Sequence, residues 1–164
     1  MSEHHQNTEF YKLQIFLSAR SCYNHAMKRR VHDGGALLRY ERGEELVSCL
    51  AAFAREVGRT GSFTVIGATS EIELGFYHLD RKEYEWKVFS GEFEVTGGVG
   101  NIAFHGEDPI VHLHTTIADN RFAAFGGHVR RLIVGATCEV SLSFHPDKLE
   151  RAMDDGIGLK LWEL

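Results

Sequence analysis

The chain has 164 residues, a length typical of one domain with a single hydrophobic core. Hydrophobic residues make up 43% of the chain and charged residues 25%, which argues against a disordered or fibrous protein. The 18 Lys and Arg residues are outnumbered by 23 Asp and Glu residues, giving a formal charge of −5 at pH 7 with neutral histidines. This balance disfavours DNA as a partner, because a nucleic-acid-binding protein normally carries a basic excess that neutralises phosphates.

The cysteines and the first residues predict a cytoplasmic protein. The three cysteines are odd in number and far apart, with no C-x-x-C pair, so they do not suggest a disulfide framework. The N-terminus lacks the basic and apolar regions of a signal peptide. No apolar run approaches the roughly 18 residues that a membrane span requires. We therefore expect a cytoplasmic location and no contact with a membrane.

Two segments are predicted along the chain. Residues 1–34 are expected to form an N-terminal extension that is partly disordered, because its first nine residues are polar. The extension contains one compact basic cluster, Lys28-Arg29-Arg30. Residues 35–164 are expected to form a single domain, since no repeat or low-complexity tract divides them.

The predicted domain begins with a short apolar strand over residues 36–40, which a helix follows. From Leu46 to Val57 the apolar residues recur at helical spacing and form one continuous stripe. Acidic residues precede this stripe, and Gly58 ends it, as is typical of a helix.

After the helix the hydrophobic pattern changes to a period of two, which predicts strands. The alternating runs cover residues 72–76, 84–88, 93–95, 111–117 and 138–144. The tail from Pro146 is expected to carry a short helical turn and a last strand over residues 157–161. Together these elements predict the α+β class: a mainly antiparallel β-sheet with one principal helix packed on it.

The ten histidines include one constellation with the spacing of a metal site. His112 and His114 are separated by one residue, so in a strand they project from the same face about 7 Å apart. Gly126-Gly127-His128 follows a turn near residues 119–121, and an antiparallel return would bring His128 beside them. Three neutral imidazoles with an open position are typical of zinc sites that accept a ligand. A histidine-bearing face that is simply exposed to solvent is the alternative interpretation.

Two further groups of residues are weaker candidates. Arg39, Glu44, Asn101, Gly126 and Gly127 are candidates for the lining of a pocket, and Glu44 is a candidate base if the protein is an enzyme. Lys28, Arg29 and Arg30 are candidates for nucleic-acid contact, although such clusters are more often solvated surface. Phosphate-loop and serine-hydrolase motifs do not occur in the sequence, which disfavours those two classes of enzyme.

From about residue 36 to residue 144 the sequence resembles one family. The motifs that carry the resemblance are Leu38-Arg39-Tyr40-Glu41-Arg42-Gly43-Glu44-Glu45-Leu46, Ile66-Gly67-Ala68, Gly91-Glu92-Phe93-Glu94-Val95, Gly100-Asn101-Ile102, Pro109-Ile110-Val111-His112-Leu113-His114, Gly126-Gly127-His128-Val129 and Glu139-Val140. They resemble the PPC domain (plants and prokaryotes conserved), in its stand-alone prokaryotic form. The resemblance implies an antiparallel sheet with one helix and assembly as a homotrimer. It also maps His112, His114 and His128 onto the family's His-x-His and Gly-Gly-His positions.

The resemblance leaves three functions open. The first hypothesis is a trimeric domain in which His112, His114 and His128 bind a divalent ion, zinc in the first place, and water or a small anionic ligand occupies the fourth position. The alternative is a DNA-binding transcriptional regulator, as family relatives are labelled, although the chain lacks the Arg-Gly-Arg-Pro element of the plant proteins. The third is an interaction platform that recruits other proteins through residues 91–97.

Overall fold

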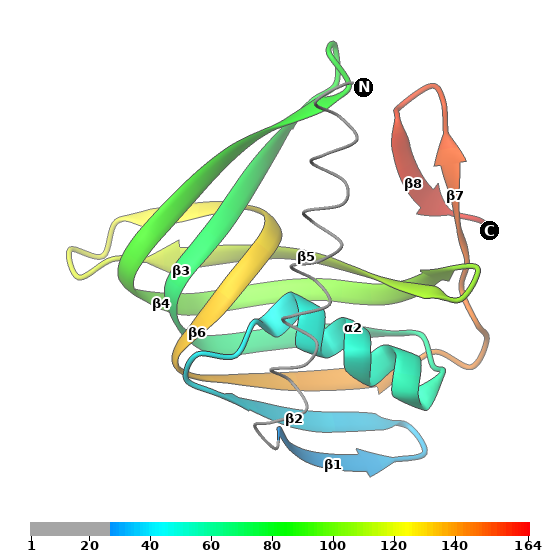
Figure 1. The fold of residues 1–164 in the computed structure, drawn as a ribbon, viewed down its shortest axis with the longest axis horizontal. Helices are drawn as coiled ribbons and strands as arrows, with labels where there is room; N and C mark the ends of the chain where they lie inside the picture. Colours follow the sequence, from blue (N-terminus) through cyan, green and yellow to red (C-terminus); the bar gives the residue numbers. More distant parts are fainter. Residues whose placement is uncertain (1–26) are drawn as a thin grey trace, which may run out of the picture.

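The computed structural model of the chain describes residues 27–164 (Figure 1). Six strands form one antiparallel sheet in the order β1-β2-β6-β3-β4-β5, and two further strands form a separate hairpin, β7–β8. The elements are, in chain order, β1 Lys28–His32, β2 Gly35–Glu41, α2 Leu46–Val57, β3 Gly61–His78, β4 Glu83–His105, β5 Asp108–Ala118, β6 Ala124–Phe144, β7 Arg151–Asp154 and β8 Leu159–Trp162.

The predicted fold class is confirmed, since an antiparallel sheet carries a single helix within residues 27–164. The strands are longer than the alternating runs suggest: β3 and β4 pair as one long hairpin that extends away from the rest of the sheet (Figure 1). Strand β1 pairs with β2 although its residues fall inside the predicted N-terminal extension. The disorder expected for part of residues 1–34 concerns mainly residues 1–26, which lie outside the described range.

The long strand β6 gives the sheet its shape, because it pairs with different neighbours along its length. Its second half lies between β2 and β3, whereas residues 124–128 pair with β5. Since β5 also pairs with β4 and β4 with β3, the strands β3, β4, β5 and β6 form a closed ring of hydrogen-bonded neighbours. This closure brings the start of β6 against β5.

Helix α2 packs on β5 and β6 and completes the hydrophobic core. Its buried face is the apolar stripe of the sequence, with Leu46, Leu50 and Phe53 fully or almost fully buried. The helix begins after Glu45, whose carboxylate accepts backbone N–H groups of the first turn, and it ends at Gly58 in the left-handed conformation. At 12 residues α2 is too short to cross a membrane, and residues 27–164 contain no other helix that could do so.

The tail differs in part from its prediction. A turn between β7 and β8 occupies residues 155–158, and no helix lies between Pro146 and Leu164. The chain reverses there because the Asp154 carboxylate accepts the Ile157 N–H at 3.0 Å and Gly158 adopts a positive φ of 80°. The expected last strand is present as β8.

Two cysteines in the described range have different states. Cys138 of β6 is free and buried, whereas Cys49 of α2 is disulfide-bonded. The number and spacing of the cysteines do not predict that bond. Because of the bond, the cysteines give no support to a reducing compartment. The cytoplasmic location stays a prediction.

Candidate metal centre

Strand β5 presents two histidines on the face opposite the core. Leu113 and Thr115 point into the protein and are buried, so the alternation of the strand turns His112 and His114 to the other face. The Nε2 atoms of His112 and His114 lie 3.1 Å apart. Without an ion, one of these nitrogens donates a hydrogen bond to the other. With an ion, the same spacing suits two ligands of one coordination sphere.

His128 reaches the same place from β6. It is the ladder partner of His114 on one side and of Gly75, in β3, on the other. Its ring centroid lies 5.1 Å from that of His112 and 5.2 Å from that of His114. One ring nitrogen of each of the three histidines lies within 4.8 Å of the others. The structure thus brings together the three histidines for which the sequence predicts one shared site.

The two glycines before His128 permit close packing of three strands. A Cβ atom on Gly127 would lie 2.9 Å from the carbonyl oxygen of Gly75, and one on Gly126 would lie 3.2 Å from that of Thr115. The contact at Gly127 requires a residue without a side chain, because real Cβ atoms almost never approach a backbone oxygen so closely, whereas the contact at Gly126 is tight and a side chain there would displace its neighbour by a few tenths of an ångström. In the structure the pair therefore sets the position of β6 against β3 and β5.

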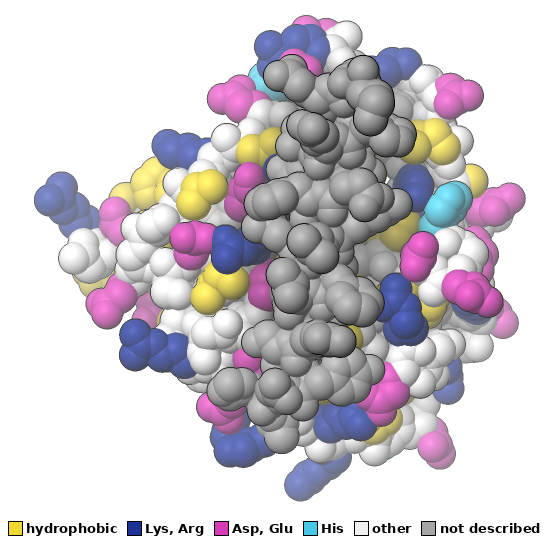
Figure 2. Space-filling view, in the orientation of Figure 1, with side chains coloured by type: hydrophobic (Ala, Val, Ile, Leu, Met, Phe, Trp, Pro, Cys, Tyr) yellow, Lys and Arg dark blue, Asp and Glu magenta, His cyan; other side chains and the backbone are white. Residues whose placement is uncertain are grey.

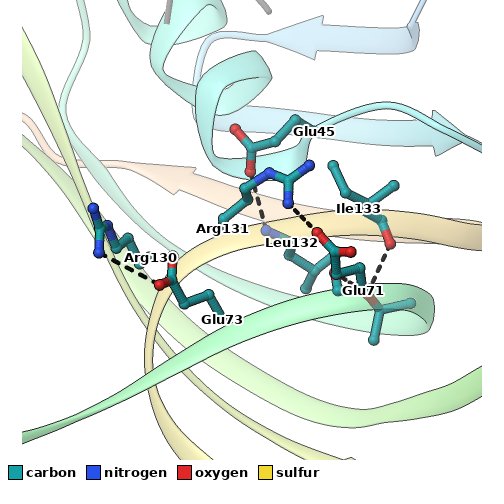
Figure 3. A network of polar contacts seen from close by, with 8 residues as sticks. Glu45, Glu71, Glu73, Arg130, Arg131, Leu132 and Ile133 are labelled. Atoms are coloured by element: carbon teal, nitrogen blue, oxygen red, sulfur yellow. Dashed lines mark hydrogen bonds and ion pairs between the residues drawn. The ribbon is translucent and has the colours of Figure 1, made fainter. Parts of the chain in front are cut away.

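A network of charged residues holds β6 just after His128 (Figure 3). Arg130 pairs with Glu73 at 3.4 Å, and Arg131 pairs with Glu71, so both guanidinium groups tie β6 to β3. The carboxylate of Glu45 accepts the backbone N–H of Leu132 at 3.1 Å while it caps α2. The helix start, β3 and β6 are therefore linked close to the histidines.

The electrostatic environment keeps two of the rings neutral. Burial, together with smaller contributions from the neighbouring charges of His114 and Arg151, lowers the pKa of His112 from 6.5 to about 4. Burial also lowers the pKa of His128 to about 4, with contributions from His112, His114 and Arg151. Neutral imidazoles retain a free lone pair at neutral pH, which is the form that binds metals. In addition, the buried Nδ1 atom of His128 has no hydrogen-bond partner among the described residues.

Arg151 of β7 lies beside the histidines and was not among the residues expected from the sequence. Its Nη2 atom donates to Oδ1 of Asn101 at 2.9 Å and lies 3.3 Å from Nδ1 of His112. Asn101 is itself the ladder partner of His112, so this pocket candidate does adjoin the cluster. A lone arginine in a four-residue strand carries no periodic signal, and only the fold shows where it lies.

Aromatic side chains flank the third histidine. The rings of Tyr84 and Trp86 stack 4.7 Å apart and lie 5.0 and 6.0 Å from the ring of His128. Gly75 makes room for them, because a Cβ atom there would lie 2.6 Å from the Trp86 ring. Both aromatic side chains remain partly exposed, so they form an apolar wall beside the cluster.

The other two pocket candidates lie elsewhere. Arg39 is exposed on β2, where it pairs with Glu41 at 2.9 Å and faces Glu139 of β6 in the ladder. Glu44 is buried beneath the start of α2, and its carboxylate accepts the backbone N–H of Glu41. None of the contacts of these two residues within residues 27–164 reaches a histidine of the cluster.

The basic cluster lies on the edge strand β1, and acidic residues neutralise two of its three members. Lys28 pairs with Glu41 at 3.5 Å, and Arg29 forms a two-pronged ion pair with Glu56. Figure 2 shows the same mixture of signs on the visible face, where Lys and Arg side chains lie among Asp and Glu side chains. This mixture of charges produces little of the positive electrostatic potential that DNA binding requires.

The fold and the histidine cluster define a class: a small antiparallel domain with a candidate three-histidine metal centre. The sequence agrees with this assignment, since residues 33–144 match the Plants and Prokaryotes Conserved (PCC) domain. The chain belongs to this family, which is the one that the histidine and glycine motifs resemble. None of the curated proteins matches the chain.

Several solved structures are similar to the chain over most of their length. A "putative DNA-binding protein" from Bacteroides thetaiotaomicron is 26% identical with a TM-score of 0.81, and the match covers 85% of this chain and 98% of that one. A second protein with that description, from Ralstonia eutropha, is 31% identical with a TM-score of 0.78 and coverage of 84% and 96%. A "metal-containing protein" from Archaeoglobus fulgidus is 28% identical with a TM-score of 0.73 and coverage of 85% and 99%.

Proposed function

We propose that the protein binds one divalent metal ion per chain, zinc in the first place, through His112, His114 and His128. The observation that carries the proposal is the convergence of three ring nitrogens within 4.8 Å from two adjacent strands. The lowered pKa values of His112 and His128 support it, because both rings are neutral at pH 7. The description of the Archaeoglobus fulgidus protein as metal-containing adds independent support.

The donor set suits a site that accepts a ligand. Zinc normally takes four ligands, and three histidines leave one position open for water or a small anion. When bound, such an ion supplies a Lewis acid that lowers the pKa of its water toward about 7. The chain contributes the scaffold: β5 and β6 fix the three rings by backbone pairing, and the aromatic wall of Tyr84 and Trp86 shields one side.

Metal analysis of the chain purified without a histidine tag tests the proposal. We expect about one equivalent of zinc per chain, and none in a variant with His112, His114 and His128 all changed to Ala. A variant in which His32, His78 and His145 become Ala is the matched control, and it should retain the metal. The proposal is wrong if the tag-free protein takes up no divalent ion, or if the first variant still binds it.

We propose in addition that the chain assembles as a homotrimer, as the family resemblance implies. Large apolar side chains remain exposed on the β3–β4 hairpin, where Phe76 is 68% and Leu79 63% accessible. Contiguous apolar surface is typical of sites that another chain covers, and an interface formed by this hairpin would bury both side chains. Sedimentation equilibrium should give three times the 18.5 kDa of the chain. A monomeric mass at micromolar concentration would contradict the proposal.

A DNA-binding regulator is the second candidate, because two of the similar structures are described in those terms. It would use Lys28, Arg29 and Arg30, repeated on each subunit of an assembly. This candidate predicts a mobility shift of duplex DNA at low salt that is lost when the three residues become Ala. We rank it second, since the chain carries a formal charge of −5 and Lys28 and Arg29 already pair with glutamates.

A further inference from the structure

Arg151 is a buried cation with neutral partners. Arg151 is only 8% exposed. Its guanidinium group remains charged at all ordinary pH values. Nη1 donates to the carbonyl of Lys160 at 2.6 Å, and Nη2 donates to Oδ1 of Asn101 at 2.9 Å. The Nε–H group is buried without any partner among residues 27–164. None of the ion pairs within residues 27–164 involves Arg151, although buried charges are normally paired with an opposite charge.

The charge imbalance becomes larger when a metal binds. The three histidines are neutral ligands, and His112 contacts both the cluster and Arg151, so a divalent ion and a guanidinium would share one half-buried region. The cluster contains no carboxylate. Two neighbouring cations without an anion repel each other strongly in a medium of low dielectric constant. An anionic ligand would remove this repulsion and also satisfy the Nε–H donor.

We propose that a small organic carboxylate binds together with the metal ion and that Arg151 is its second contact. The inference rests on the proposed metal site and names the class of its ligand. Arginine suits this role, because its planar donors match the two oxygens of a carboxylate. The partly exposed rings of Tyr84 and Trp86 beside His128 favour an organic acid over an inorganic anion, since they offer apolar surface to a carbon-bearing group.

The C-terminal hairpin holds Arg151 in position for this contact. The chain enters β7 along the end of β4, where Phe104 N–H donates to the carbonyl of Leu149 at 2.9 Å. At the other end of the hairpin, Tyr77 and Lys82 of the β3–β4 hairpin donate to the carbonyls of Ile157 and Asp155, each at 2.6 Å. Both ends of the β7–β8 hairpin are therefore fixed. A guanidinium that is already ordered costs less conformational entropy when the ligand binds.

The test is whether metal and carboxylate bind cooperatively. The metal-free full chain is titrated with Co²⁺ and followed by visible absorption, in acetate and in chloride at equal ionic strength, with correction for cobalt complexed by free acetate. Chloride can bind the metal, but as a single atom it does not offer the guanidinium the two oxygens of a carboxylate. We expect acetate to tighten cobalt binding about tenfold relative to chloride. In R151Q the ratio should fall below about twofold, R151K should lie between the two, and R121Q, which removes an exposed arginine, should match the unchanged protein.

Each outcome bears on the proposal. Equal cobalt affinity in acetate and chloride would overturn this inference and leave the metal site standing, as would a full acetate effect in R151Q. Absence of cobalt binding in both salts would overturn the metal site and this inference with it. If R151Q fails to fold, the unchanged chain still decides: by linkage, cobalt must tighten acetate binding by the same factor, measured by calorimetry.

Discussion

His114 of strand β5 and His128 of strand β6 are direct partners in the β5–β6 ladder, and their ring centroids lie 5.2 Å apart. Backbone hydrogen bonding therefore sets the separation of the two residues from which the imidazoles extend. His112 joins them from the same face of β5, with its Nε2 atom 3.1 Å from that of His114. Because the two strands already place the three histidines side by side, a metal ion would need little rearrangement of the backbone to bind.

Single substitutions should show that the three histidines act as one site. Changing His112, His114 or His128 to Ala one at a time removes one of three ligands, so each variant should bind zinc more than about tenfold more weakly. Competition with a chelating dye measures the affinity. His32→Ala, which changes an exposed histidine on β1, is the control and should leave it unchanged. A cluster member whose loss has no effect would not be a ligand.

The stability of the metal-free protein should fall as the pH falls from about 6.5 toward about 4. The pKa values of His112 and His128 are lowered to about 4 in the native state, whereas unfolded histidines titrate near 6.5. Between these values the unfolded state binds more protons than the native state, so the free energy of unfolding decreases with falling pH. Below about pH 4 both states are protonated and this contribution is lost.

Urea denaturation in the presence of EDTA, at about pH 7.5 and about pH 5, measures the effect. Other groups also titrate in this range, so the informative quantity is the difference between the unchanged chain and His128→Gln. Glutamine does not titrate, and the variant should therefore lose less stability on acidification. Equal losses in the two proteins would show that His128 is not held neutral by burial.

Local patterns are sufficient to predict the helix and the histidine strand. The apolar stripe from Leu46 to Val57 coincides with the bounds of α2, because a helix on a sheet buries one continuous face. The alternation around His112 and His114 gives the strand and the face, because neighbouring residues of a strand point to opposite sides. These properties depend on the segment itself, and they therefore leave a signal in the sequence.

Properties that depend on long-range pairing are not visible in the same way. Strand β1 is exposed along its whole length and shows no alternation, so its pairing with β2 has no hydrophobic signal. Arg151 lies 39 residues from His112 in the chain, and its contact depends on how β7 meets the end of β4. Arg39 and Glu44 are pocket candidates from the sequence that lie away from the cluster. Arg39 lies on β2, which pairs with β1 and β6 but not with β5, and Glu44 is buried at the start of α2.

Removing the hydroxyl group of Tyr40 should stabilise the protein. Tyr40 is fully buried and its hydroxyl has no hydrogen-bond partner within residues 27–164, so folding desolvates it without compensation. Burial raises the pKa of this phenol well above its ordinary value, with a further contribution from the nearby Glu44 carboxylate. We expect Tyr40→Phe to raise the free energy of unfolding by about 1 kcal/mol.

Tyr77→Phe is the matched control for that change, because the Tyr77 hydroxyl donates to the carbonyl of Ile157 at 2.6 Å. Losing this bond should lower the free energy of unfolding by about 1 kcal/mol. Chemical denaturation of both variants compares the two signs directly. Destabilisation by Tyr40→Phe would mean that its hydroxyl is satisfied, for instance by an internal water.

Glu45 connects the start of α2 to β6, and its loss should affect both stability and metal affinity. Its carboxylate accepts the N–H groups of Val47 at 3.1 Å and Ser48 at 2.7 Å, and also that of Leu132 at 3.1 Å, four residues after His128. Glu45→Ala leaves all three donors without this acceptor and should lower the free energy of unfolding by about 2 kcal/mol or more.

Zinc affinity should fall with it, because the segment of β6 that carries His128 loses its tie to the helix. Urea denaturation and dye competition measure the two effects in the same preparations. Glu107→Ala, in the exposed turn between β4 and β5, removes an equal charge and should change neither quantity by a measurable amount. If Glu45→Ala lowers stability but leaves zinc affinity at the level of the control, the β5–β6 ladder alone positions His128, and the helix cap serves only the fold.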